Sequence, residues 1–228
     1  MVTNNIYAFC IVNAKIQKNN ETPKQFIKVN NIPLYLYSVN TFIAHAHIDK
    51  VLLITRNEDI SHLKKELQKE EKVMDVISGG ETRQLSVYNA LTYLKKKGIK
   101  DDDFVLIHDA ARANISASII NESLKKLEEN HAVNTVIPLS DSCIEVTDEN
   151  IKSLDRDKIF LSQTPQSFHF GDIYMCHLKL LEEGITNSSD DISIALRFNI
   201  PVGLINGSKL NFKITTHEDL SFFESLKK

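Results

Sequence analysis

Short apolar runs rich in β-branched residues alternate along the chain with longer stretches whose apolar positions recur at helical spacing. The short runs predict buried strands at residues 6–12, 51–55, 76–77, 104–107, 133–138 and 202–205. The longer stretches predict helices at residues 34–47, 60–71, 82–97, 116–129, 172–183 and 189–198, and a last helix from residue 216. This alternation predicts an α/β fold of the Rossmann-like, doubly wound type, with a mostly parallel sheet.

The pattern changes between Ser140 and Phe160, where polar and apolar residues alternate on either side of the turn signal Asp148-Glu149-Asn150. We interpret this stretch as a projecting β-hairpin arm, at about residues 139–160. A lone hairpin cannot bury both of its faces, so it either folds back on its own domain or pairs with a second subunit. We expect it to mediate dimerisation of a chain that otherwise forms one domain over residues 1–228.

Charge and cysteine content limit the possible partners and compartment. The 228 residues carry 27 basic and 30 acidic side chains, a net charge of -3, which argues against binding nucleic acid or an anionic membrane. The sequence shows neither a signal peptide nor a long apolar run of transmembrane length. Its three widely spaced cysteines suit a reducing compartment, so we expect a cytoplasmic protein.

Ligands of open parallel sheets bind where strands end at the carboxyl edge, so residues that follow the strands are the first candidates. After the first strand, residues 13–25 form a loop whose Lys24 would reach a phosphate near a helix start. A solvated surface lysine is the alternative, and the loop has no glycine, because the first in the chain is Gly79. Taken alone, this signal is weak.

The second candidate is the segment from Gly79 to Ser86, which follows a strand and opens a helix. The glycine pair, Gly79 and Gly80, permits a tight turn and close approach of a ligand, while Arg83 and Ser86 lie one helical turn apart. A base or phosphate would fit here. A plain strand-to-helix turn with a surface arginine is an equal alternative.

The third and sharpest candidate is His108-Asp109-Ala110-Ala111-Arg112, directly after an apolar strand. A carboxylate at a strand end, followed by two small residues and an arginine, makes a compact site for magnesium and an anionic substrate. Asp109 is the leading metal ligand. A helix-capping aspartate in a structural ion pair is the alternative.

Two later segments add cations. Arg156, on the predicted arm, would bind phosphate across a dimer interface, with Gln163-Thr164-Pro165-Gln166 following it. Lys213 leaves a late strand toward the same sheet edge as the other candidates. Each of these segments is unremarkable by itself.

Together the segments resemble the 2-C-methyl-D-erythritol 4-phosphate cytidylyltransferases and the related ribitol-5-phosphate cytidylyltransferases, over nearly the whole chain. The matching elements are Pro23-Lys24-Gln25-Phe26, Gly79-Gly80-x-x-Arg83-x-x-Ser86-Val87, His108-Asp109-Ala110-Ala111-Arg112, Asp155-Arg156, Gln163-Thr164-Pro165-Gln166-x-Phe168, and Asn211-x-Lys213-Ile214-Thr215-Thr216 with Glu218-Asp219-Leu220. Six matches in the same order make the resemblance specific.

The resemblance implies transfer of CMP from CTP to a sugar-alcohol phosphate, with magnesium, release of pyrophosphate and no covalent enzyme intermediate. 2-C-methyl-D-erythritol 4-phosphate, a precursor in isoprenoid biosynthesis, is the favoured acceptor, and ribitol 5-phosphate or another pentitol phosphate is the alternative. By motif, the catalytic residues are Lys24 and Lys213; the nucleotide-binding residues are Gly79, Gly80, Arg83, Ser86, Asp109 and Ala110; and the acceptor-binding residues are Arg112, Ser142, Arg156 and Thr164. Ser142 and Arg156 would come from the arm of the partner in a homodimer.

One element departs from the family pattern. The family loop Ala-Ala-Gly-x-Gly-x-Arg-Met-Gly is replaced by a segment with Asn13 and Lys15 at glycine positions and Gln17 near the arginine position. Lys18 is the candidate replacement, although a lysine lacks the planar fork of an arginine. Loss of a transition-state cation predicts a deficit of about a hundredfold or more. A catalytically impaired relative with a binding or regulatory role is therefore the second hypothesis, and CTP binding without turnover would favour it.

Overall fold

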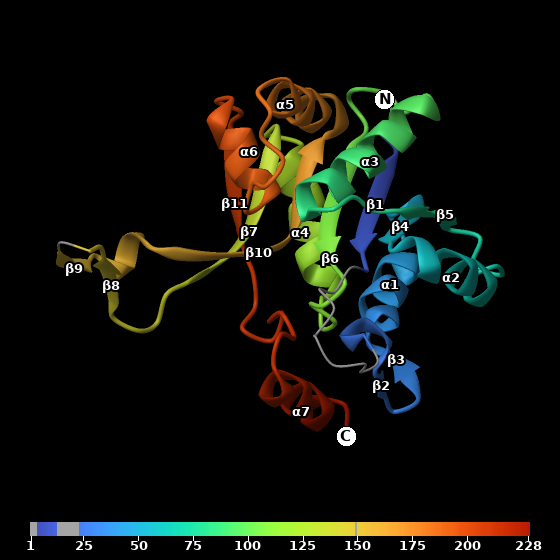
Figure 1. Cartoon of the computed structure of the whole chain (residues 1–228), viewed down its shortest axis with the longest axis horizontal. Coiled ribbons are helices and arrows are strands. Elements are labelled where there is room, and N and C mark those ends of the chain that lie inside the picture. The colour runs from blue at the N-terminus through green and yellow to red at the C-terminus, as the bar shows by residue number, and fades with distance from the viewer. Residues whose placement is uncertain (1–3, 13–22, 149) are drawn as a thin grey trace.

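The computed structural model describes residues 4–12, 23–148 and 150–228. Its central sheet has seven strands in the order β11-β7-β10-β6-β1-β4-β5 (Figure 1). All pairings are parallel except those of β10, which runs antiparallel to both of its neighbours. The strands are β1 Ile6–Ile11, β4 Lys50–Thr55, β5 Val73–Ser78, β6 Phe104–Asp109, β7 Ala132–Pro138, β10 Phe160–His169 and β11 Val202–Asn206. The predicted α/β, mostly parallel fold is confirmed.

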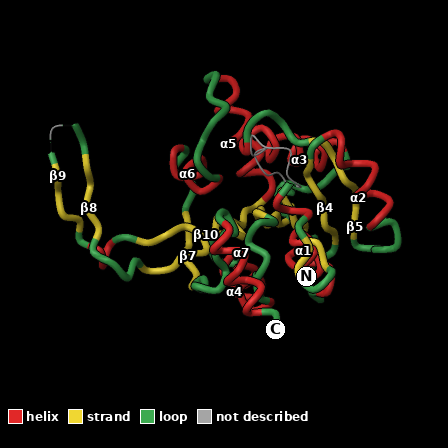
Figure 2. The backbone as a smooth tube through the Cα atoms, turned by 60° about the horizontal axis from the view of Figure 1, so that its bottom comes forward, coloured by secondary structure: helices red, strands yellow, loops and turns green. Residues whose placement is uncertain are grey.

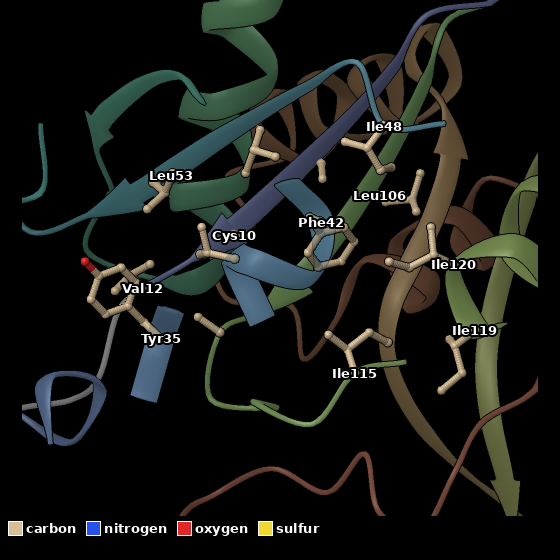
Figure 3. Packing of buried hydrophobic residues seen from close by; sticks show 14 of the residues in the cluster. Cys10, Val12, Tyr35, Phe42, Ile48, Leu53, Leu106, Ile115, Ile119 and Ile120 are labelled. Atoms are coloured by element: carbon tan, nitrogen blue, oxygen red, sulfur yellow. The ribbon is translucent and has the colours of Figure 1, made fainter. Parts of the chain in front are cut away.

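Helices cover both faces of the sheet because the side chains of a strand point alternately to either side. Cys10 and Val12 face one layer, formed by α1 Leu34–Ala44, α2 Ile60–Glu66 and α4 Ala117–Leu127 (Figure 3). Phe9 and Ile11 face the other layer, formed by α3 Arg83–Lys96, α5 Phe170–Glu182 and α6 Asp191–Arg197. The described chain thus has an apolar core on each side of a sheet that is buried on both faces, and a third, smaller apolar cluster that includes Leu34, Ile214 and Phe223.

Capping residues set where several helices begin and end. The Thr82 side chain accepts from the Leu85 amide at the start of α3, and Gly98 follows its end with a φ of 78°. A capping box formed by Thr216 and Asp219 starts α7, His217–Leu226. These boundaries agree with the predicted ones.

Two predicted helices were too long. The helix predicted to run to residue 71 ends at Glu66, because the Glu70 amide bonds to the carbonyl of the buried Leu67 and turns the chain toward β5. The helix predicted to run to residue 47 ends at Ala44, where the His45 amide turns back to the Phe42 carbonyl. In both places a tertiary turn ends a helical pattern.

Strand β10 was not predicted, although it lies in the middle of the sheet between β6 and β7. Its residues Gln163, Thr164 and Gln166 are polar yet buried, and Pro165 interrupts the strand pattern. The register against β7 shifts between Ser162 and Gln166. Buried polar side chains need partners, and here they find them in β6, in α6 and in the segment after β11.

Two small sheets lie outside the central one. Strands β2 Lys28–Val29 and β3 Ile32–Pro33 pair before α1, and β8 Cys143–Val146 pairs with β9 Ile151–Leu154. The hairpin of β8 and β9 stands away from the central sheet in both views (Figures 1 and 2). Three 3-10 helices, η1 Lys24–Phe26, η2 Asn57–Asp59 and η3 Arg156–Lys158, complete the elements of the described residues. None of the helices described is both long and apolar enough to cross a membrane.

Candidate active site

The candidate residues gather where β1 and β6 end, side by side. The chain runs from β1 outward to β4 and β5 and then returns to the other side of β1 with β6, so the connection order switches between these two strands. Asp109, the last residue of β6, lies opposite Ile11 at this point. Ligands of doubly wound sheets bind at such a switch point. Topology thus places Asp109 where a ligand is expected.

Asp109 is held between two cations. Its Oδ2 lies 2.7 Å from the Lys213 ammonium nitrogen and its Oδ1 lies 3.0 Å from Arg83 Nε. Burial alone would raise the pKa of Asp109, but the charges and hydrogen bonds of Arg83 and Lys213 hold it well below its ordinary value. The carboxylate therefore stays ionised near neutral pH, although its side chain is only 11% exposed.

Arg83 connects Asp109 to a second carboxylate, that of Asp191, in the protein interior. Its Nη1 donates to Asp191 Oδ2 at 2.7 Å, and Asp191 Oδ1 lies 3.2 Å from His177 Nε2. Burial works to lower the pKa of Arg83, but Asp191 and Asp109 together raise it above its ordinary value. Sequence reasoning missed Asp191 and His177. The only signal was the pair Asp190-Asp191 at the start of a predicted helix, which reads equally well as a helix cap.

The segment that carries Lys213 is fastened to the loop after β6. The Ile214 amide donates to the Ala111 carbonyl at 2.9 Å, and Arg112 Nη1 donates to the Asn211 carbonyl at 3.0 Å. Asn211 Nδ2 in turn donates to the Thr164 carbonyl on β10 at 2.9 Å. Motifs separated by about fifty to about a hundred residues along the chain are thereby joined in space. Burial lowers the pKa of Arg112, and Asp109 works against that effect.

His108 and Thr164 form hydrogen bonds that hold the backbone at Asp109 in place. The Asp109 amide donates to Thr164 Oγ1 at 3.1 Å, and Thr164 Oγ1 lies 3.1 Å from His108 Nδ1. His108 Nε2 lies 3.1 Å from the Arg112 carbonyl, which can only accept, so this nitrogen carries the proton of a neutral ring. Burial lowers the pKa of His108 to about 4, with Asp109 opposing. A neutral imidazole thus links both ends of the loop.

The lowered pKa of His108 predicts a loss of stability in mild acid. The unfolded chain takes up a proton near the ordinary pKa of about 6.5, while the folded chain resists protonation down to about 4. Stability from this group is complete above about pH 6.5 and falls as the pH drops toward 4, by about 2 kcal/mol at pH 5. Urea unfolding of the wild-type protein and of His108→Gln at pH 7 and pH 5 measures this fall in the free energy of unfolding, which we expect to be smaller in the variant.

The exposed His217 offers the matched control for that experiment, and His217→Gln is expected to keep the pH dependence of the wild-type protein. If the free energy of unfolding falls equally between pH 7 and pH 5 for the wild-type protein and His108→Gln, the assignment of this effect to His108 is contradicted.

The Gly79-Gly80 turn joins β5 to α3. The Gly80 amide donates to Ser86 Oγ at 3.0 Å, and the Gly79 amide donates to the Thr55 carbonyl at 2.7 Å. A Cβ on Gly80 would lie 2.5 Å from the Leu85 Cβ, so the turn requires glycine there. Ala110 is buried, with its amide bonded to the Ile11 carbonyl. Both backbone segments therefore have tightly fixed positions at the carboxyl edge of the sheet.

Lys24 reaches the same edge. It begins η1, and its ammonium group donates to the Thr215 carbonyl, two residues beyond Lys213. The loop that precedes it lies outside the described residues, and with it Asn13, Lys15 and Gln17, where the sequence departs from the family pattern, and the candidate replacement Lys18.

Ser142 and Arg156 lie apart from this cluster. Arg156 begins η3 next to the β8–β9 hairpin, and its Nη1 donates to the Ser140 carbonyl at 3.2 Å. Ser142, just before β8, is exposed. The β8–β9 hairpin, next to which both residues lie, stands away from β6 and the rest of the central sheet (Figure 1). Within one chain the structure therefore brings together Lys24, Arg83, Asp109, Arg112, Thr164 and Lys213, but not the two arm residues.

Comparison with known proteins extends over most of the chain. The family model described as IspD, 2-C-methyl-D-erythritol 4-phosphate cytidylyltransferase, matches residues 14–227. A protein of that name from Dictyoglomus thermophilum is 39% identical over 210 residues, which cover 89% of this chain and 88% of the relative. A ribitol-5-phosphate cytidylyltransferase from Lactiplantibacillus plantarum is 31% identical over 228 residues, which cover 97% of each protein. Among solved structures, 4-diphosphocytidyl-2C-methyl-D-erythritol synthase from Anaerococcus prevotii matches with a TM-score of 0.85 and 25% identity, over 99% of both chains.

Proposed function

The chain belongs to the 2-C-methyl-D-erythritol 4-phosphate cytidylyltransferase family, and from this we propose that it transfers CMP from CTP to 2-C-methyl-D-erythritol 4-phosphate, releasing pyrophosphate. The observation that carries the proposal is the junction of Asp109, Lys213 and Arg83 at the switch point of the sheet. Three of the family-like motifs meet there, although they are far apart in sequence.

The reaction needs positioned cations more than a nucleophilic side chain. A phosphate oxygen of the acceptor attacks the α-phosphorus of CTP, a new P–O bond forms, and the bond to pyrophosphate breaks. Negative charge accumulates around the α-phosphorus in the transition state, so fixed positive groups lower the barrier. In our proposal Lys213 stabilises the α-phosphate, while Lys24, held at the neighbouring Thr215 carbonyl, contacts the triphosphate.

The nucleotide would lie over the Gly79-Gly80 turn. We assign Gly79, Gly80, Arg83 and Ser86 to the cytosine end and Asp109 with Ala110 to the ribose and phosphate end. The requirement for glycine at Gly80 comes from its close contact with Leu85, which fixes the turn whose backbone would face the base in this proposal. Arg83 Nη2 is buried without a partner among the described residues, so it retains one donor for a ligand.

Magnesium is the metal that suits Asp109. A hard carboxylate oxygen at a strand end fits a hard cation, and magnesium commonly takes one or two carboxylates together with phosphate oxygens and water. Within the described residues no group of three or more His, Cys, Asp or Glu side chains forms a metal cage. Asp109 would therefore share the ion with substrate oxygens. Bound there, the ion would neutralise charge on the triphosphate.

The arm fits a role in a homodimer. Its side chains Ile144, Val146 and Ile151 are 58%, 65% and 68% exposed, which is unfavourable for apolar groups on a free hairpin. We propose that two arms pair with the opposite subunits and that Ser142 and Arg156 complete the acceptor site of the partner, beside Thr164 and Arg112. The free thiols of Cys10, Cys143 and Cys176 suit the reducing cytoplasm, where we place the protein.

Ribitol 5-phosphate is the second candidate acceptor. The relative from Lactiplantibacillus plantarum that is named for this substrate matches 97% of the chain, although at 31% identity rather than 39%. The higher identity favours methylerythritol phosphate. Both acceptors present a phosphate to the same arginines, so the distinction rests on the polyol.

Pyrophosphate release tests the proposal directly. Purified protein is given CTP and magnesium with either 2-C-methyl-D-erythritol 4-phosphate or ribitol 5-phosphate. We expect release that requires the methylerythritol substrate, at a rate below that of relatives with an intact glycine-rich loop. Release only with ribitol 5-phosphate would change the assigned acceptor, and CTP binding without release for either would support an impaired relative with a binding role.

A further inference from the structure

A chain of polar contacts, in which the charge alternates from Lys213 to Asp191, runs from the exposed edge of the site into the protein interior. It contains four consecutive contacts, of 2.7, 3.0, 2.7 and 3.2 Å, that join in order Lys213, Asp109, Arg83, Asp191 and His177. The side chain of Lys213 is 44% exposed, whereas those of Asp191 and His177 are fully buried. The outer residues of this chain are assigned to substrate, and the inner two have no assigned role.

Burying the carboxylate of Asp191 costs free energy, because the charged group loses its hydration. Burial by itself raises the pKa of Asp191, but the charge of Arg83 and the His177 hydrogen bond together hold it below its ordinary value. It therefore remains an anion inside the α3, α5 and α6 layer. A buried carboxylate persists only where its partners compensate for the lost hydration.

The position of Asp191 is fixed from the sheet. The Asp191 amide donates to Gln166 Oε1 at 2.9 Å, and Gln166 Nε2 donates to Asp190 Oδ2 at 3.1 Å. Gln166 lies on β10, so the start of α6 is attached to the centre of the sheet beside β6. The carboxylate of Asp191 thus faces Arg83 from a rigid support.

We propose that Asp191 is a positioning residue for nucleotidyl transfer, acting through Arg83 on Asp109. With Asp191 in place, the guanidinium is shared between two carboxylates and only its Nε reaches Asp109. Without Asp191, the guanidinium loses the partner that fixes its orientation at Nη1 and turns until Nη2, which has no partner among the described residues, joins Nε on Asp109, the two-nitrogen pairing that arginine prefers. This pairing draws Asp109 Oδ2 away from Lys213. The inference rests on the proposed function, because its effect is on catalysis.

Asp191→Asn tests this, with Asp190→Asn as the matched control. Both variants remove one negative charge from adjacent positions, but asparagine at 190 still accepts from the Ser193 amide that it caps and gives up only the bond from Gln166 Nε2. The bond from the Asp191 amide to Gln166 Oε1, which positions Asp191, stays in place. We expect kcat to fall at least tenfold in Asp191→Asn, with a smaller change in KM for CTP. Asp190→Asn is expected to stay within about twofold of the wild-type protein.

A double-mutant cycle with Arg83→Gln distinguishes positioning from general stability. If Asp191 acts through Arg83, then Asp191→Asn costs at most about threefold once Arg83 is gone. The same loss in both backgrounds would overturn the inference, as would equal kcat values for the two asparagine variants. Thermal unfolding of each protein shows that it is folded at the assay temperature.

The inference can also be tested if Asp191→Asn is unstable, and it can be separated from the proposed function. If Asp191→Asn does not fold, Asp191→Glu takes its place, with Asp190→Glu as control. Its added methylene displaces the carboxylate against Arg83 while keeping the charge, and an unchanged kcat would overturn the inference. Pyrophosphate release by the wild-type protein separates the two proposals: without release the proposed function fails, and with release that is insensitive to Asp191 only the positioning role fails.

Discussion

Replacing Lys213 with alanine is expected to lower kcat for pyrophosphate release by about a hundredfold to a thousandfold. The ammonium group lies 2.7 Å from the Asp109 carboxylate and has no other anionic partner among the described residues, so an arriving phosphate competes for it directly. Loss of one preorganised charge beside a developing phosphorane costs about 3–4 kcal/mol of transition-state stabilisation. Steady-state pyrophosphate release with both substrates saturating measures the effect.

Lys209→Ala is the control for that variant. Lys209 is an exposed lysine in the same segment between β11 and α7, and we expect its replacement to leave kcat unchanged. Calorimetry with CTP and magnesium separates binding from turnover. Retention of more than a tenth of wild-type kcat in Lys213→Ala would remove Lys213 from the catalytic role.

Mixed dimers of two inactive variants are expected to recover about half of wild-type activity. In our proposal each site combines Lys213 of one chain with Arg156 of the partner's arm. A dimer of Lys213→Ala with Arg156→Ala then has one site with both residues and one with neither, as a twofold dimer requires. The two homodimers lack a cation in both sites and are expected to be at least about a hundredfold slower.

Co-expression with two different tags and sequential purification isolates the mixed dimer for this assay. Lys158→Ala is the matched arm variant, since Lys158 is exposed in η3 and pairs only with Asp155 and the local backbone in the described chain. It should be fully active as a homodimer. A mixed dimer no more active than its parents would place Arg156 outside the partner's site.

The sequence by itself determined the fold class and most of the elements. Strands such as β1 and β6 are continuous apolar runs, and helices such as α3 have a cap, an apolar stripe and a terminal glycine, so local patterns decide them. The motif around Asp109 was also identifiable, because an acid and an arginine directly after a buried strand stand out against its apolar residues. Such features depend on residues close together in the chain.

Only the tertiary structure decided the rest. Strand β10 escaped detection because its buried Gln163, Thr164 and Gln166 find their hydrogen-bond partners in parts of the chain that are distant in sequence, which local polarity does not reveal. Asp191 and His177 were missed for the same reason, because the importance of each depends on partners elsewhere in the chain. The burial of Asp191 is tolerable only because Arg83, about a hundred residues earlier, supplies the opposite charge, and His177 has its hydrogen-bond partner in Asp191. Whether a buried polar group destabilises the protein depends on hydrogen-bond and charge partners that are distant in sequence, and these partners come together only when the chain folds.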